Sequence, residues 1–485
     1  MIRRTSSLTL FLITLASLAA VLAMPAITLA QSANDEVDQL KRTVRDLQSR
    51  VAALEQQTEK ANAQSMPTGS SGAEAAAALA AATSEVRRAA TVTSSRAREA
   101  GTSTAQALPA NLPGGATLNY MLDGYYEYNF NQPPGRVNDL RAYDVLSNAF
   151  SINQADIVFA LDPNVAAGRR YGFRVDLQFG QATETSQGNP ANEPRPDIYR
   201  NIFQVYGTYV VPLGRGLNID VGKWASSLGA EGNFTKDQIN YTRSFYFYFL
   251  PFYHAGVRTA YHVNDKLQLN YWVVNGTNQQ EPTNGYKDEL FGYVLQPRKS
   301  LTWTTNYYLG QDHPDSATAT NCPAPVQPGL CLAPIYPAPN GKLHIFDTYA
   351  TWQVRPKLTL QGEADYVIQR EWANAAPGES SAPSHVDGGA AYAQYEFSPR
   401  ISVAARGEYL SDRGGLFSQT TQALKEATST YEYKFGEGFD GFLEFRRDWS
   451  NRPYFQTNQA AAPSNHQNTA AVGLVWWYGG KQGAW

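Results

Sequence analysis

Residues 358–368 have the sequence LTLQGEADYVI. In an extended chain successive side chains point to opposite faces, so the apolar and small residues at the even positions share one face. The polar residues share the other face: Thr359, Gln361, Glu363 and Asp365. A soluble sheet hides its apolar face in a core, but here the same pattern recurs along most of the chain. This repetition predicts a transmembrane β-barrel, with lipid outside and water inside.

The same alternation predicts about sixteen antiparallel strands in an all-β, up-and-down barrel that spans residues 116–485. Besides 358–369, the predicted strands lie near 116–130, 150–161, 171–179, 202–211, 217–224, 254–263, 267–275, 288–296, 301–310, 343–354, 387–397, 401–410, 426–435, 441–449 and 468–478.

The connectors between these strands alternate between short turns and long polar loops. The short turns include 212–216 and 355–357, and the long loops include 225–253 and 311–342. Outer-membrane barrels have this arrangement because their turns face the periplasm and their loops face outside. A soluble β-sandwich has no reason to sort its loops in this way. The pattern therefore predicts the outer membrane of a Gram-negative-type bacterium, with both chain ends on the periplasmic side.

The composition of the chain agrees with a barrel. Mean hydropathy is only −0.41, but a barrel needs apolar residues only at every second position. The 485 residues include 29 Tyr, 21 Phe and 9 Trp, and Tyr and Trp concentrate at membrane interfaces. Outer-membrane lipid is therefore an expected partner. Nucleic acid is not, because the formal net charge is −3.

The first 115 residues predict three segments that precede the barrel. Residues 1–30 have the basic start, apolar run and small-residue cleavage site of a secretory signal peptide. Residues 31–60 carry a heptad repeat with Val at each a position and Leu at each d position, which predicts a coiled-coil helix in the periplasm. Residues 61–115 are rich in Ala, Ser and Thr and predict a linker.

The number of chains in the coiled coil is open from the heptad alone. Val at a with Leu at d favours two strands. Residues 50–55, RVAALE, instead resemble a trimerisation motif in which Arg bonds the Glu of a neighbouring chain. We therefore expect a homotrimer, held through the barrel sides and this helix. The alternative is a solvated helix that only packs on the barrel rim.

Residues 222–276 resemble the OmpL-like β-barrel porin-2 family. The matching features are a strand that ends in Gly-Lys, a loop with Gly-Ala-Glu, a Tyr-Thr-Arg-Ser run, and Pro-Phe-Tyr-His-Ala-Gly-Val at the next strand. The resemblance covers residues 116–485 and implies a porin, with little indication of its solute. Residues 473–478, GLVWWY, resemble the C-terminal signal of outer-membrane barrels, which implies the barrel assembly machinery as a partner.

Charged residues in the polar phase of the strands are the predicted pore-lining residues. On the lipid side Arg or Lys costs about 2–4 kcal/mol at mid-depth, so these residues must face inward. Opposed charges around a pore discriminate among solutes by charge and orientation. Alternatively, they only brace the wall through ion pairs. The set comprises Arg174, Asp176, Arg258, Glu363, Asp365, Arg406, Glu408, Glu432, Lys434, Glu444 and Arg446.

The long aromatic loop 225–253 is the predicted constriction. A sixteen-stranded barrel is wide enough for an aqueous channel, so narrowing it requires a loop folded inward. The alternative is an external loop that packs on a neighbouring protomer. The candidate constriction residues are Lys236, Asp237, Arg243, Tyr246 and Tyr248.

The remaining motifs indicate neither a metal nor catalysis. Cys322 and Cys331 lie in one loop of an exported chain, which predicts a local disulfide. Only two His residues near them are even arguable ligands, so we expect no metal and no cofactor there. The chain has no nucleophile elbow, Walker loop or His-Glu-x-x-His motif, and an enzyme is not expected.

The sequence thus favours a trimeric porin for the passive diffusion of small hydrophilic solutes. The alternative is a structural or adhesive protein, in which the barrel anchors surface loops and the coiled coil acts as a periplasmic spacer.

Overall fold

The computed structural model describes residues 112–186, 195–312, 316–318, 332–334, 342–370, 383–436, 438–459 and 462–480. The predicted signal peptide (1–30) and coiled coil (31–60), the linker as far as residue 111, and both cysteines lie outside the described residues.

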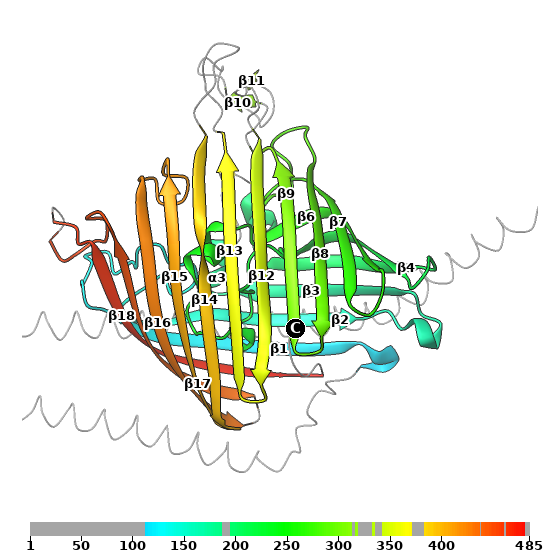
Figure 1. Cartoon of the computed structure of the whole chain (residues 1–485), viewed down its shortest axis with the longest axis horizontal. Coiled ribbons are helices and arrows are strands. Elements are labelled where there is room, and N and C mark those ends of the chain that lie inside the picture. The colour runs from blue at the N-terminus through cyan, green and yellow to red at the C-terminus, as the bar shows by residue number, and fades with distance from the viewer. Residues whose placement is uncertain are drawn as a thin grey trace, which may run out of the picture. The chain divides into compact units, whose positions relative to one another are not determined.

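Sixteen strands form one closed barrel, in which each strand pairs antiparallel with its neighbours along the chain and β1 closes the barrel against β18 (Figure 1). The predicted fold class and strand number are confirmed. The strands are β1 (Thr117–Asn129), β2 (Ala149–Leu161), β3 (Tyr171–Phe179), β4 (Ile202–Val211), β5 (Leu217–Ala225), β6 (Tyr253–His262), β7 (Leu267–Val274), β8 (Asp288–Arg298), β9 (Leu301–Gly310), β12 (Leu343–Arg355), β13 (Leu358–Gln369), β14 (Ser384–Ser398), β15 (Ile401–Arg413), β16 (Gln422–Gly436), β17 (Phe439–Ser450) and β18 (His466–Gly479).

The remaining elements are short and lie before β1 or in the connectors between strands. They are η2 (Pro113–Gly115), η3 (Val165–Ala167), α3 (Gln181–Ser186), α4 (Pro196–Tyr199), η4 (Thr235–Asp237), α5 (Phe245–Phe249), and the paired strands β10 (Ser316–Thr318) and β11 (Leu332–Pro334). Short connectors such as 212–216 and 356–357 join the strands at one end, and longer ones such as 226–252 join them at the other. Among the described residues, no helix is long and apolar enough to cross a membrane.

The side chains of the strands are sorted in the opposite sense to a soluble sheet. On β13, Leu360 faces outward and is 37% exposed, whereas Asp365 faces inward and is 5% exposed. Large apolar side chains on the outer face of other strands are also exposed, including Leu443, Phe445 and Trp476. Lipid is the solvent that such an outer face requires.

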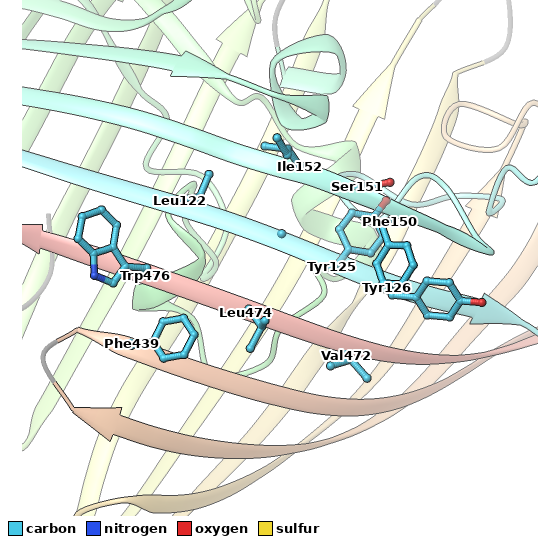
Figure 2. A pocket seen from close by; sticks show the side chains of 11 residues that line it. Leu122, Tyr125, Tyr126, Phe150, Ser151, Ile152, Phe439, Val472, Leu474 and Trp476 are labelled. Carbon is cyan, nitrogen blue, oxygen red and sulfur yellow. The ribbon is translucent and has the colours of Figure 1, made fainter. Parts of the chain in front are cut away.

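An apolar groove with a volume of about 670 Å³ runs along the outer face of β1, β2, β17 and β18 (Figure 2). Gly124 lies in this groove and adds no side chain to it, and Phe150 beside it is 89% exposed. Leu122, Ile152, Leu474 and Trp476 also line the groove. Because these side chains belong to the outward phase of their strands, the groove is part of the outer face and not of the lumen.

Candidate functional site: the inner wall and the loop within the barrel

Residues 226–252, between β5 and β6, lie inside the barrel, and we refer to them as the inner loop. The first part of this loop follows the inner faces of β12 and β13. Gly229 N–H donates to Asp347 Oδ1 at 3.1 Å, and Ala230 N–H donates to Glu363 Oε1 at 3.2 Å. Gly229 has φ +88°, and an added Cβ would lie 3.2 Å from Glu363 Oε1. This position therefore favours glycine in both conformation and space.

The middle of the inner loop reaches the opposite wall, formed by β1, β2 and β3. The side-chain amides of Gln154 and Gln178 both donate to Asn233 at 3.0 Å, the first to its backbone oxygen and the second to Oδ1. Thr235 Oγ1 donates to Asp123 Oδ2 at 2.7 Å. The loop therefore crosses the lumen from one side of the barrel to the other.

The returning part of the inner loop binds β15 and β17. The N–H groups of Tyr241 and Thr242 donate to the two oxygens of Glu444 at 2.8 and 3.0 Å. Arg406 donates to Thr242 O at 2.6 Å and pairs with Glu231 at 2.8 Å. Arg406 thus ties the two sides of the loop to the wall, because Glu231 belongs to its first part and Thr242 to its return.

The short helix α5 begins on a carboxylate of the wall. The two oxygens of Glu408 accept the N–H groups of Phe245 and Tyr246, both at 2.9 Å. A negative charge at the first turn of a helix satisfies N–H groups that have no partner within the helix. Burial raises the pKa of the Tyr246 phenol, and the nearby carboxylates of Asp365 and Glu408 add to the shift. Glu408 and Asp365 therefore lie close to the buried start of α5.

Arg243 braces the inner loop from within. Its guanidinium donates to the backbone oxygens of Tyr241 and Asn233 at 2.8 Å and of Gly232 at 3.2 Å. The residue is only 1% exposed. Arg243 therefore holds the two sides of the inner loop together.

Residues 130–148, between β1 and β2, also turn inward, and we refer to them as the first loop. Arg141 pairs with Asp448 of β17 at 2.8 Å, and both side chains are fully buried. The hydroxyl of Tyr143 donates to Asn233 Oδ1 at 2.5 Å. The first loop therefore packs on the inner loop, and the two together occupy the middle of the lumen.

Two cavities lie beside these loops. The vestibule, with a volume of about 570 Å³, lies between the first loop, α3 and the end of the inner loop, and its lining includes Arg141, Gln181, Glu184, Tyr248, Phe249, Phe252 and Asn278. The narrow cavity, of about 30 Å³, has room for a few water molecules at most, and its lining includes Tyr143, Phe203, Glu231, Asn233, Phe247 and Phe252. Phe252 lines both cavities, so the two lie next to each other.

The eleven predicted pore-lining residues all lie on the inner face but divide into two groups. One group is buried against the inner loop or its neighbours on the wall: Asp176, Glu363, Asp365, Arg406, Glu408, Glu444 and Arg446. The other group is partly exposed within the barrel: Arg174, Arg258, Glu432 and Lys434. In this second group Arg174 pairs with Asp176 at 2.8 Å, and Arg258 pairs with Asp220 at 2.7 Å. A pore-lining role for either group remains a prediction.

The five predicted constriction residues occupy three surroundings. Arg243 and Tyr246 are buried, and Tyr248 lines the vestibule. Lys236 and Asp237 form an ion pair at 2.7 Å in η4. The loop that carries all five lies within the barrel and not on its outside.

Sequence reasoning missed the contact between Arg141 and Asp448. Asp448 shares the inward phase of Glu444 and Arg446, so the alternation along residues 441–449 was a usable signal for it. Arg141 lies in a connector without periodicity, and no local pattern shows that its side chain turns into the lumen.

Known proteins include a family that matches this chain and a solved structure of similar fold. No curated protein matches this chain. The outer membrane channel DcaP of Acinetobacter baumannii has 10% identity and a TM-score of 0.50, over 77% of this chain and 100% of that one. A loop-deletion mutant of OmpT, an outer membrane protein of Vibrio cholerae, has 10% identity and a TM-score of 0.44, over 75% of this chain and 99% of that one. These likenesses concern the fold alone. The family described as beta-barrel porin-2, OmpL-like, matches residues 115–476. The chain therefore belongs to the OmpL-like beta-barrel porin-2 family.

Proposed function

We propose that this outer-membrane porin conducts small hydrophilic solutes through its lumen, past the first loop and the inner loop. The observation that carries the proposal is the inner loop, which crosses the lumen and is bound to the wall on both sides. A sixteen-stranded barrel without such a loop leaves a wide aqueous channel. The size of the passage therefore depends on the two loops and not on the barrel.

The partly exposed charged residues determine which charges the passage favours. Arg174, Arg258, Glu432 and Lys434 lie on strands within a few residues of the short connectors, beyond the inner loop from the vestibule. A passage lined by both signs of charge discriminates among solutes by charge and orientation. The mechanism is sieving by size and field, without a reaction.

The direct experiment is conductance of the full chain in planar lipid bilayers, together with swelling of loaded liposomes. We expect stepwise single-channel currents, and blockade by sugars, amino acids or organic acids identifies the preferred solute class. A barrel that inserts but passes no ions would contradict the proposal and favour the alternative, an anchor for surface loops. Deletion of residues 31–115 separates the two further, because a pore keeps conducting and a tether loses its spacer.

We further propose a homotrimer that uses the barrel sides and the predicted coiled coil 31–60. The apolar groove on β1, β2, β17 and β18 supports this proposal, because an exposed concave apolar surface suits a neighbouring barrel as well as lipid. Sedimentation of the full chain in detergent, compared with a variant without residues 31–60, tests it. Three chains per complex is the expected result, with weaker association in the variant. A monomer in both samples would exclude the trimer.

The proposed location places residues 31–115 in the periplasm and leaves insertion of the barrel to the barrel assembly machinery. The C-terminal motif at residues 473–478 supports the second point, since it lies in β18, the strand that closes the barrel. Protease treatment of intact and of permeabilised cells tests the first, and cleavage within 31–115 is expected only after permeabilisation.

A further inference from the structure

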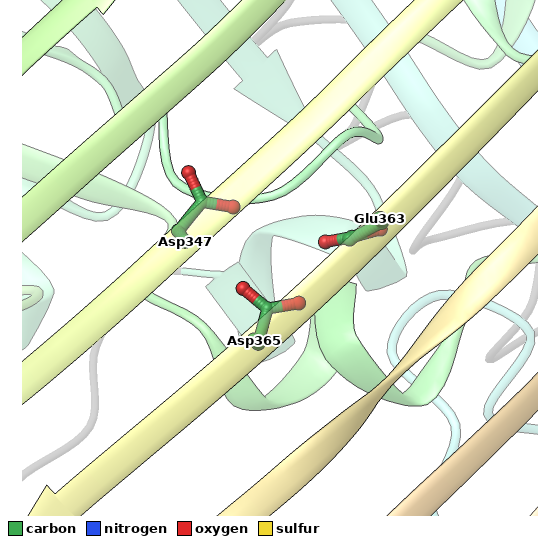
Figure 3. A group of neighbouring side chains, drawn as sticks. All are labelled: Asp347, Glu363 and Asp365. Carbon is green, nitrogen blue, oxygen red and sulfur yellow. The ribbon is translucent and has the colours of Figure 1, made fainter.

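Three carboxylates meet on the inner wall beneath the first part of the inner loop. Asp347 on β12 pairs across the sheet with Asp365 on β13, and Glu363 lies two residues before Asp365 on the same face. Figure 3 shows the three carboxyl groups directed toward a common space. One oxygen of each lies within 4.8 Å of the others. All three residues are buried.

Asp365 lacks the hydrogen-bond donors that its burial requires. Neither Oδ1 nor Oδ2 accepts a hydrogen bond from any described group, although both atoms are buried. An unpaired buried charge is costly, and such groups are normally paired or coordinate a metal. The two neighbours of Asp365 in the cluster are acceptors as well, so neither of them as a carboxylate supplies the missing partner.

The other two carboxylates are held as acceptors. The two oxygens of Asp347 accept from Gly229 N–H at 3.1 Å and from Asn306 Nδ2 at 2.8 Å. Glu363 accepts from Ala230 N–H. Hydrogen bonds from N–H groups favour the ionised form of a carboxylate. Among the described residues, no Lys or Arg forms an ion pair with any of the three. The cluster therefore brings three acidic side chains together and, among the described residues, has no Lys or Arg paired with it.

We propose that Asp347, Glu363 and Asp365 bind a divalent cation, with Ca²⁺ as the best fit. Ca²⁺ takes oxygen ligands at 2.3–2.6 Å, so two oxygens on opposite sides of it lie roughly 5 Å apart, close to the spacing of this cluster. An all-oxygen ligand set suits a hard cation. Ca²⁺ tolerates irregular geometry and completes its shell with water, whereas Mg²⁺ demands a near-ideal octahedron.

The cation would fasten the inner loop to the wall. Gly229 and Ala230 bind the same carboxylates that would hold the ion, so occupancy of the site and the position of this part of the loop are linked. The binding site itself is independent of what the barrel conducts. Its effect on current rests on the proposed channel function.

Binding is measured on the full chain in detergent after removal of metal with a chelator. Isothermal titration with Ca²⁺ should show one saturable site per chain, and Mg²⁺ should bind more weakly. Tb³⁺, a luminescent substitute for Ca²⁺, should be sensitised by Tyr392, whose hydroxyl lies 3.4 Å from Glu363 Oε2, and Ca²⁺ should displace it. These readouts require no conductance, so a failure to conduct leaves the binding result intact.

The variant Asp365→Asn should lose at least about tenfold in Ca²⁺ affinity and lose the Tb³⁺ signal. Asp440→Asn is the matched control, because Asp440 is also an inward carboxylate of the wall but bonds Trp477 and lies outside the cluster. Glu363→Gln is a second variant if Asp365→Asn does not fold, as judged by heat-modifiable migration on gels. Unchanged affinity in folded Asp365→Asn, or no saturable binding by the parent chain, would overturn the proposal.

Discussion

Glu408 on β15 accepts the backbone N–H of Phe245 at 2.9 Å, although the two residues are 163 positions apart in the chain. The same carboxylate accepts Tyr246 N–H at the same distance. The wall thus holds the inner loop through carboxylates that receive backbone donors, and Glu444 repeats the arrangement with Tyr241 and Thr242. These charges, which the alternation assigns to the lumen, here bind backbone groups of the inner loop.

Replacement of Glu408 by Ala should therefore loosen α5 without unfolding the barrel. Two buried N–H groups would lose their acceptor, which costs about 1–3 kcal/mol for each unsatisfied group. We expect a lower midpoint of urea unfolding and noisier single-channel currents. The urea midpoint of Glu408→Gln should fall between those of the parent and of Glu408→Ala, because Gln retains an acceptor oxygen. Unfolding at the parent midpoint with quiet currents would show that Glu408 does not hold the loop.

The narrow cavity makes a separate prediction about conductance. Tyr143 and Phe247 both line it and pack edge to face against each other, with ring centroids 5.1 Å apart. Truncation of either ring to Ala should widen the passage, raise single-channel conductance and admit larger sugars in the swelling assay. Phe346→Ala is the control, because this ring lies on the outer face of β12. Equal conductance in all three variants would place the passage elsewhere in the barrel.

The strands were predictable because their signal is local. The predicted strand at 202–211 matches β4, and alternation alone placed Glu363 and Asp365 on the inner face. Strand ends were less exact: β14 spans Ser384–Ser398, whereas 387–397 was predicted. Beyond the apolar belt neither face needs apolar residues, so the alternation there fades while the backbone ladder continues.

Contacts of the inner loop could not be predicted in the same way. Tyr241 and Glu444 meet from positions 203 apart, and nothing in the sequence near either residue specifies the other. Inward phase shows that a side chain faces the lumen, but burial there depends on where the loop lies. For this reason Arg258 and Arg446 were predicted alike, although Arg258 is partly exposed and Arg446 is buried.

Arg258 should contribute to ion selectivity. Its side chain is 24% exposed and pairs with Asp220, so its removal leaves an uncompensated negative charge beside the passage. A unit charge about 4 Å from an ion in water contributes about 1 kcal/mol, so Arg258→Gln should raise the cation-to-anion permeability ratio by up to about fivefold. Reversal potentials in a salt gradient measure this ratio. Arg413→Gln, which removes an exposed charge on the outward phase of β15, should leave it unchanged. A shift in the opposite direction would contradict the assignment.

Removal of divalent cations should change the current, because it loosens the first part of the inner loop. If Ca²⁺ neutralises Asp347, Glu363 and Asp365, then a chelator leaves three close negative charges without a counterion. Repulsion among them would weaken their contacts with Gly229 and Ala230, because the carboxylates must separate or take up protons. We expect the chelator to increase current noise in the parent chain, and added Ca²⁺ to reverse the effect. Asp365→Asn should show the same noise with and without the chelator, since it no longer holds the ion. A chelator effect of equal size in the parent and in Asp365→Asn would mean that the cation acts at a different place, such as the lipid surface, and would separate that effect from the inner loop.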